Sequence, residues 1–403
     1  MRTSNRESQA PESTLDQPRA ESGSILQRRA APGASRLFEV PRSTSNLVPP
    51  CADRLRAYMD PIFDPEEGEA SIVALMEHRF AAFHDVPHCV AYANGFWSLV
   101  SAIRALALPG CDEIVMPSLT YRRLADVAAW AGLRPRFCEV DGDSLTASVA
   151  TMEPCISPRT ALILPAHPIV GVLDAAGLTA MARHHRVPIL FDAVESVYEV
   201  LPEGRIGRFG DAEVFSLHAS KLLNGFEGGY VTTQDTQLAA RLRAARDHGR
   251  GPGGLNARLS GLHAAAALAA LDEVEAQVEH NRAIYLAYRR HFAGITGLAV
   301  RTFDETTRSS FKNILVEIDP DFWPLTRDDT VRALNAEGAL ARAYYAPPLH
   351  RKPMAYPHVP ADLPLTDALA ARFLLMPCGH FVSETDVAVI AGLMRRFARG
   401  RAA

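Results

Sequence analysis

Hydrophobic and polar positions along the chain form short runs that alternate between two periods. Between residues 69 and 83, apolar side chains recur at intervals of three and four, which predicts an amphipathic helix. The apolar run at 89–92 is short and predicts a buried strand. Further helices are predicted at 99–106 and 124–130, and further strands at 113–116, 136–140, 161–164, 188–191, 213–216 and 229–232. This alternation predicts an α/β fold with a mostly parallel sheet and helices on both faces.

The pattern changes in the last third of the chain. Residues 259–294 form one long helical stretch, which we expect to connect a large domain to a smaller one. A strand at 313–318 and helices at 327–337 and 384–396 then predict a C-terminal α+β arrangement.

The first residues carry no hydrophobic period. They are rich in Ser, Arg, Glu and Pro, a composition typical of disordered segments. A chain of 403 residues exceeds the size of one ordinary core, so two folded domains are expected. We predict a disordered tail at 1–48, a large α/β domain at 49–275 and a small α+β domain at 276–403.

Composition narrows the range of functions. The formal net charge of −4 argues against a nucleic-acid partner, and no apolar run is long enough to cross a bilayer. The six cysteines form no CxxC pair, and no HExxH motif or Cys/His quartet is present, so we expect reduced thiols and no metal site. The N-terminal segment matches neither a signal peptide nor a transit peptide. These observations predict a cytoplasmic protein.

Lysine is scarce in this chain. Of 42 basic residues, only Lys221, Lys312 and Lys352 are lysines. Arginine stays protonated in proteins, whereas a lysine can lose its proton and act as an amine nucleophile. Lys221 ends the small-residue, largely uncharged stretch "FSLHASK" at 215–221. This context favours a reactive amine over a surface lysine.

Other chemically suggestive residues follow predicted strands, where parallel sheets build ligand sites. The Asn94-Gly95 turn could bind a phosphate at the start of a helix, or could be an ordinary turn. Asp192 is a carboxylate that is costly to bury without a cation, although aspartate also serves as a helix N-cap. Ser216 could donate to a phosphate or close a turn. Tyr121 could lie against a planar cofactor or fill the core.

A phosphate turn, a buried acid, a stacking ring and an amine together describe a pyridoxal 5′-phosphate site, in which the cofactor is an electron sink. Asp192 would keep the pyridine nitrogen protonated, a pair worth roughly 4 kcal/mol before desolvation. Lys221 would hold the aldehyde as an imine and, once released by substrate, would carry protons.

These residues lie in segments that resemble the DegT/DnrJ/StrS-type sugar aminotransferases, within the fold type I pyridoxal-phosphate enzymes. The resemblance extends from about residue 65 to 397. Its matching segments are the Asn-Gly turn at 94–95, "DEIVMPSLTY" at 112–121, "FDAVES" at 191–196, "GRFGDAEVFSLHASK" at 207–221, "EGG" at 227–229, "NARLS" at 256–260 and "YYAPPLH" at 344–350. Their common order and spacing make the resemblance specific.

The resemblance implies a role for each residue around the cofactor ring. Lys221 would be the Schiff-base lysine, and Asp192 would pair with the pyridine nitrogen. Glu195 would lie near the 3-hydroxyl group, and Tyr121 would stack on the ring.

The resemblance also implies how the phosphate and the substrate are held. The backbone of Gly95 and Phe96, together with Ser216, would bind the phosphate. Asn256 would reach the phosphate in the neighbouring subunit, so a homodimer with shared active sites is implied. Two residues would lie on the substrate side: Tyr345 and His350.

The chain departs from the family pattern at several positions. Phe96 stands where a threonine is usual, so one hydroxyl contact to phosphate is missing unless Ser98 supplies it. One extra residue follows His167 before the next glycine, so His167 receives no role. Arg122-Arg123 could recognise a phosphate, a carboxylate or a pyrophosphate, or could form an exposed helix start.

We therefore expect an aminotransferase that moves an amino group from glutamate or glutamine to a keto sugar, nucleotide-linked in the first instance, or to a keto cyclitol. Two alternatives stay open. One is an elimination or oxidation on the same cofactor and fold. The other is a non-catalytic regulator that binds the cofactor or a sugar.

Overall fold

The computed structural model describes residues 36–43, 51–64, 66, 68–171, 173–247, 254–304 and 307–400. All of these residues belong to one compact unit. The larger part of the predicted tail, residues 1–35 and 44–48, lies outside the described residues. The domain boundary expected between residues 275 and 276 stays a prediction.

The central sheet has its strands in two groups, with the orders β4-β3-β5 and β6-β9-β10-β2. These strands are β2 (His88–Tyr92), β3 (Glu113–Pro117), β4 (Arg134–Cys138), β5 (Thr160–Ile163), β6 (Leu190–Asp192), β9 (Ala212–Ser216) and β10 (Gly229–Thr233). Single bridges at Ile163–Ile189 and Ala166–Asp192 join the two groups. Among these strands, β10 alone runs in the opposite direction to the others. The predicted mostly parallel sheet is confirmed.

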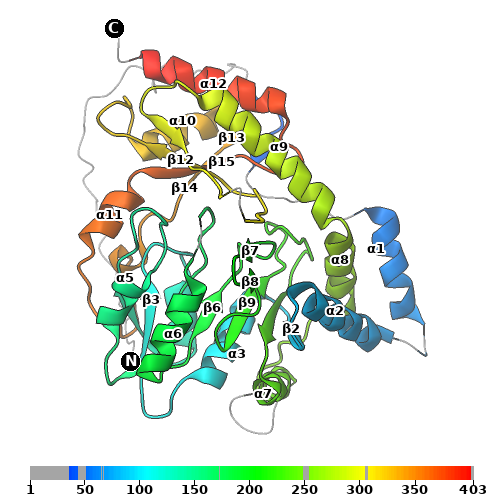
Figure 1. Ribbon diagram of the computed structural model, residues 1–403. Helices are drawn as coiled ribbons and strands as arrows, with labels where there is room; N and C mark the ends of the chain where they lie inside the picture. The colour runs from blue at the N-terminus through cyan, green and yellow to red at the C-terminus, as the bar shows by residue number, and fades with distance from the viewer. Residues whose placement is uncertain are drawn as a thin grey trace, which may run out of the picture. The chain divides into compact units, whose positions relative to one another are not determined.

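Side chains on each strand point alternately to two apolar layers, as the pleat of a strand requires. Val90 and Tyr92 of β2 belong to one layer, and Cys89 and Ala91 belong to the other. The first layer is covered by α3 (Gly95–Leu106), α4 (Leu124–Trp130) and α7 (Thr236–Arg246). The second is covered by α2 (Gly68–His84), α5 (Val149–Met152), α6 (Ala175–His185) and α8 (Gly261–Asp272). The predicted helices on both faces of the sheet are therefore confirmed (Figure 1).

The C-terminal part has an antiparallel sheet with strand order β11-β12-β15-β14. Its strands are β11 (Leu298–Val300), β12 (Ile314–Ile318), β14 (Arg342–Ala343) and β15 (Phe373–Met376), and its helices are α10 (Arg327–Ala336), α11 (Pro364–Ala370) and α12 (Glu384–Arg399). Helix α9 (Val274–Phe292) leads into this part and packs along α12 (Figure 1). The α+β arrangement expected here is present.

Small elements complete the described fold. They are β1 (Arg42–Ser43), α1 (Ala52–Met59), the hairpin of β7 (Val200–Leu201) and β8 (Gly204–Arg205), β13 (Ala339–Leu340), and three short 3₁₀ turns at Asp60–Phe63, Glu153–Cys155 and Leu349–Arg351.

Two expectations differ from the structure. The single helical stretch at 259–294 is two helices, α8 and α9, which meet at Glu273, the C-cap of α8 and the N-cap of α9. Residues 36–43 are ordered rather than part of a disordered tail. Phe38 is buried, β1 pairs in parallel with β13, and Arg42 Nε lies 3.0 Å from Asp386 Oδ2. Contacts with residues about 300 positions away order this segment, and its local composition does not reveal them.

Candidate active site

The turn between β2 and α3 brings together the residues predicted to hold a phosphate. Asn94 caps α3, because its Oδ1 accepts a hydrogen bond from Trp97 N at 3.0 Å. Gly95 begins the helix, where backbone N–H groups lack intrahelical acceptors and the helix dipole favours an anion. A Cβ at Gly95 would lie 3.3 Å from Ser216 Oγ, and one at Gly229 would lie 2.5 Å from Gly95 N. Glycine at both positions therefore lets the helix start, β9 and β10 approach one another.

Phe96 and Ser98 supply no free hydroxyl donor to this turn. The Phe96 ring lies edge-on to Trp97 and Trp130, with the Arg123 guanidinium 5.3 Å from its centre. Ser98 is buried and its Oγ donates to the Asn94 carbonyl at 3.0 Å. Because a serine has one hydroxyl proton, Ser98 cannot also donate to a phosphate while this bond is in place.

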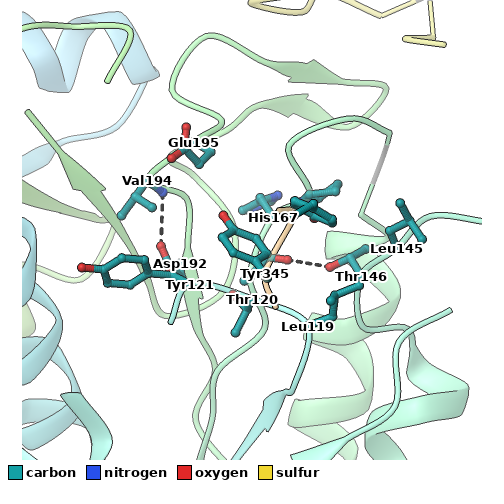
Figure 2. A pocket seen from close by; sticks show the side chains of 13 residues that line it. Leu119, Thr120, Tyr121, Leu145, Thr146, His167, Asp192, Val194, Glu195 and Tyr345 are labelled. Atoms are coloured by element: carbon teal, nitrogen blue, oxygen red, sulfur yellow. Dashed lines mark hydrogen bonds between the residues drawn. The ribbon is translucent and has the colours of Figure 1, made fainter. Parts of the chain in front are cut away.

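Asp192 ends β6 on the floor of a pocket (Figure 2). Its side chain is buried, and Oδ1 accepts a hydrogen bond from Val194 N at 3.2 Å. Burial raises the pKa of Asp192 to about 6, although the Val194 N–H and the charge of Lys221 act in the opposite direction. A carboxyl group in this position is well placed to pair with a cation that enters the pocket.

Glu195, three residues further along the same pocket wall, is held between two lysines. Lys221 Nζ donates to Oε1, Lys312 Nζ lies 3.2 Å from Oε2, and Asn313 Nδ2 donates to Oε2 at 3.3 Å. Burial alone would raise the pKa of Glu195. The two ammonium groups outweigh that effect and hold the pKa well below its usual range. Glu195 is therefore an ionised carboxylate inside the protein.

A tight loop between β9 and β10 carries Lys221. Within it, Leu217 N donates to Gly228 O at 2.9 Å, and Ala219 N donates to Phe226 O at 3.0 Å. Lys221 N itself donates to His218 O at 2.8 Å. These bonds fix the backbone, so the lysine side chain is directed to Glu195. Glu195 links the two residues predicted to serve the cofactor, because it contacts Lys221 and lines the same pocket as Asp192.

Two tyrosines, Tyr121 and Tyr345, line the pocket together with Asp192 (Figure 2). Tyr121 follows β3, and 38% of its surface is exposed in the single chain. Tyr345 comes from the segment after β14, so the C-terminal sheet contributes to the pocket. Burial raises the pKa of the Tyr345 phenol well above its ordinary value, and the negative charges of Glu195 and Asp192 add to the effect. Tyr345 therefore presents a neutral hydroxyl group.

His167 also lines the pocket, although sequence reasoning gave it no role. Its backbone N donates to Asp192 O at 2.8 Å, and its ring is tilted against Phe191 with centroids 5.3 Å apart. Nε2 lies 3.2 Å from Glu213 Oε2, while Gly207 N and Phe209 N donate to the other oxygen of Glu213. The backbone pairing of His167 with Asp192 brings His167 to the pocket wall. The spacing of motifs along the sequence does not predict this pairing.

Of the predicted site residues, Tyr121, Asp192, Glu195 and Tyr345 line this pocket. Gly95, Phe96, Ser216 and Lys221 are not part of its lining, and neither are His350 and Asn256. His350 is held between Ser118 and Asp367, with Nδ1 2.7 Å from Ser118 Oγ and Nε2 3.3 Å from Asp367 Oδ1. Asn256 is exposed, and the next residue, Ala257, accepts a hydrogen bond from Ala93 N at 2.8 Å. The roles expected for both residues stay predictions.

Comparison with known proteins places this geometry in a family. The model of the DegT/DnrJ/EryC1/StrS aminotransferase family matches residues 69–395, which is most of the chain. The chain belongs to this family. The site therefore belongs to a pyridoxal-phosphate-dependent aminotransferase.

Several members of the DegT/DnrJ/EryC1/StrS family are similar over long stretches. The UDP-N-acetyl-3-dehydro-alpha-D-glucosamine 3-aminotransferase of Acidithiobacillus ferrooxidans is 29% identical, over 81% of this chain and 88% of its own length. The L-glutamine:2-deoxy-scyllo-inosose aminotransferase of Micromonospora echinospora is 34% identical, over 47% of this chain and 45% of its own. The crystal structure of DesI with its TDP-sugar product superposes with a TM-score of 0.84 at 33% identity, covering 92% of this chain and 96% of DesI.

The residues of this family member fit its cofactor. Among the described residues, none places a cation in direct contact with the buried carboxyl group of Asp192, and a pyridinium nitrogen would supply one. The glycine-lined start of α3 with Ser216 would receive the phosphate, and the Lys221 amine would reach the aldehyde. When bound, pyridoxal phosphate supplies an aldehyde that exchanges amino groups and a ring that stabilises the charge left by Cα proton removal.

The described helices give no candidate for a membrane span, since none is both long enough and apolar enough.

Proposed function

We propose that this aminotransferase moves an amino group from glutamate or glutamine to a keto sugar or to a keto cyclitol. A nucleotide-linked keto sugar is the favoured acceptor. The observation that carries the reaction type is the partly buried contact between Lys221 and Glu195 beside Asp192. A primary amine in contact with one pocket-lining carboxylate and near a second supports this reaction type, because an aminotransferase needs an amine to hold its cofactor and an acid to tune the ring.

Each residue has a defined task in this proposal. Lys221 Nζ would hold the cofactor and, once free, would take the Cα proton of the donor and deliver a proton to the carbon that receives the amine. Asp192 would keep the pyridine nitrogen protonated. Glu195, which contacts the Lys221 amine, would orient that amine and lie near the 3-hydroxyl group. Tyr121 would stack on the ring and Tyr345 would lie on the substrate side, and both line the pocket.

The exchange balances without an outside oxidant. The donor gives its amino group and its Cα hydrogen and takes the carbonyl oxygen, so it becomes an oxo acid. The acceptor gives its carbonyl oxygen and becomes the amine. Water carries oxygen between the two half-reactions, and Lys221 returns to its starting state.

The relatives support the substrate class. One is named for a UDP-linked 3-dehydro sugar, one was crystallised with a TDP-sugar product, and one is named for an inosose, which is a keto cyclitol. We extend the proposal to a cytoplasmic homodimer in which Asn256 of each subunit reaches the phosphate site of the other. The exposure of Asn256 in the single chain supports this arrangement.

The test uses purified protein loaded with pyridoxal phosphate, a donor and a panel of nucleotide-linked keto sugars and inososes. Mass spectrometry should detect an amino product that forms in a one-to-one ratio with 2-oxoglutarate or its glutamine counterpart. The Lys221→Ala variant should give none. Product without donor consumption would indicate elimination or oxidation. If neither glutamate nor glutamine changes the cofactor's absorbance, the protein is a binding module rather than a transferase.

A further inference from the structure

Lys312 occupies a position that the family's reaction does not by itself explain. Lys312 is only 3% exposed, and its ammonium group lies 3.2 Å from Glu195 Oε2. The other oxygen of the same carboxylate contacts Lys221. Two of the chain's three lysines therefore share one carboxylate inside the protein.

The three residues come from separate parts of the fold. Glu195 follows β6 and Lys221 follows β9, both in the central sheet, whereas Lys312 comes just before β12 in the C-terminal sheet. Asn313, the next residue, also donates to Glu195 Oε2 at 3.3 Å. The segment that enters β12 thus ties the C-terminal sheet to the wall of the active site.

Burying this lysine is costly. Burial lowers the pKa of Lys312, and the charges of Lys221 and Arg342 add to that effect, while Glu195 opposes it. An uncharged residue of similar length, such as methionine, would avoid the cost if filling space were the only task. A buried cation that is kept despite this cost indicates that its charge is used.

The role of the Lys312 charge follows from the change in the charge of Lys221 during the proposed reaction. While Lys221 is an ammonium group, Glu195 has two cationic partners. The proposed reaction requires Lys221 to bond covalently to the cofactor and then to act as a neutral amine, and in those states Lys221 no longer balances Glu195. Without Lys312, Glu195 would then be an unpaired buried charge beside Asp192.

We propose that Lys312 is a positioning residue: it is the permanent counter-ion that keeps Glu195 ionised and in place whenever Lys221 gives up its own charge. With Lys312 present, the charges of Asp192 and Glu195 are matched by Lys312 and a pyridinium nitrogen. This inference rests on the proposed function, because that function is what makes Lys221 change its charge.

A double-mutant cycle on the cofactor-free protein tests the coupling. Lys221→Ala and Lys312→Met each leave Glu195 one cation, but the double variant leaves it none. Its melting temperature should fall by about 5 °C more than the two single shifts combined. The excess should vanish when the cycle is repeated in a Glu195→Gln background, because no charge then needs balancing. Lys352→Met, which removes the third lysine, should combine additively with Lys221→Ala.

A second measurement keeps Lys221 and stays informative if the variant that lacks both Lys221 and Lys312 does not fold. The Lys312→Met holoprotein should lose pyridoxal phosphate on dilution at least about ten times faster than wild type, and adding Glu195→Gln should reverse most of the loss. Additive melting shifts, an excess that persists with Glu195→Gln, or an unchanged dissociation rate would overturn the inference. The cofactor-free cycle requires no turnover, so its outcome is separate from that of the substrate screen.

Discussion

Gly95 and Ser216 approach each other so closely that a methyl group on Gly95 would lie 3.1 Å from Ser216 Cβ. One residue begins α3 and the other ends β9, so a helix start and a strand end meet at one point. Only a residue without a side chain permits that approach unless Ser216 gives way.

Gly95→Ala should therefore weaken cofactor binding by about tenfold or more, because the methyl group displaces the Ser216 hydroxyl and narrows the phosphate turn. Titration of the cofactor-free protein with pyridoxal phosphate, followed by absorbance, measures the effect. Gly142→Ala is the matched control, because a Cβ there meets no atom within 4 Å. Equal affinities for wild type and Gly95→Ala would show that the phosphate binds elsewhere.

The two serines near this turn give a second comparison. Ser216→Ala removes a hydroxyl that faces the phosphate turn, and a hydrogen bond to a charged group contributes about 1.5–3 kcal/mol. We expect the affinity for pyridoxal phosphate to fall between roughly tenfold and a hundredfold. Ser98→Ala removes a hydroxyl that already donates to the Asn94 carbonyl, so affinity should stay within about twofold and only stability should change. The reverse ranking would assign the phosphate to Ser98.

The candidate site residues predicted from the sequence share one property: each lies at the end of a strand with a strong apolar signal or within a few residues of it. Asp192 and Ser216 end β6 and β9, and Gly95 follows β2 by three residues. Because parallel strands end at a common sheet edge, positions distant in sequence could be assigned to one site. The amine of Lys221 was identifiable because lysine is so rare in this chain.

Other residues could not be found this way, because tertiary packing alone brings them to the site. Lys312 precedes a strand of a different sheet, and nothing in the local pattern indicates which carboxylate it meets. His167 is placed by the register between residues 165–167 and Asp192. Phe38 is buried although it lies in a polar, proline-containing segment. In each case the deciding contact joins positions far apart in the chain.

The raised pKa of Asp192 predicts a pH dependence of stability in the cofactor-free protein. The folded pKa of about 6 exceeds the ordinary value of 3.8, so the folded state holds this proton more tightly than the unfolded state. The stability that results is complete below about pH 4 and is lost as pH rises through about 6, amounting to about 3 kcal/mol. Thermal unfolding of wild type and Asp192→Asn between pH 4.5 and 7.5 should show this loss in wild type only.

Bound pyridoxal phosphate should remove that pH dependence. A pyridinium nitrogen next to Asp192 favours the ionised carboxylate, which lowers its folded pKa toward or below the ordinary value. The wild-type holoprotein should then show no decline attributable to Asp192 over the same range. If the difference between wild type and Asp192→Asn is the same with and without cofactor, Asp192 does not face the pyridine ring.

The position of Asn256 raises the question of which subunit's site it serves. Its neighbour Ala257 bonds to Ala93 beside the Asn94-Gly95 turn of the same chain, yet Asn256 itself is exposed. Asn256→Asp should weaken cofactor binding through repulsion between the new carboxylate and the phosphate. Mixing this variant with Lys221→Ala shows whether Asn256 acts at the cofactor site of its own chain or at that of the partner.

In a homodimer with shared sites, random pairing of the two variants should yield native sites in about one quarter of positions, because Lys221 of one chain then meets Asn256 of the other. At a limiting concentration of pyridoxal phosphate, activity should therefore rise above that of either preparation after the two are unfolded together and refolded, or after they are co-expressed. Each preparation treated alone is the control. If Asn256 serves its own chain, no pairing combines an intact Lys221 with an intact Asn256, and the mixture shows no gain because every site retains at least one defect.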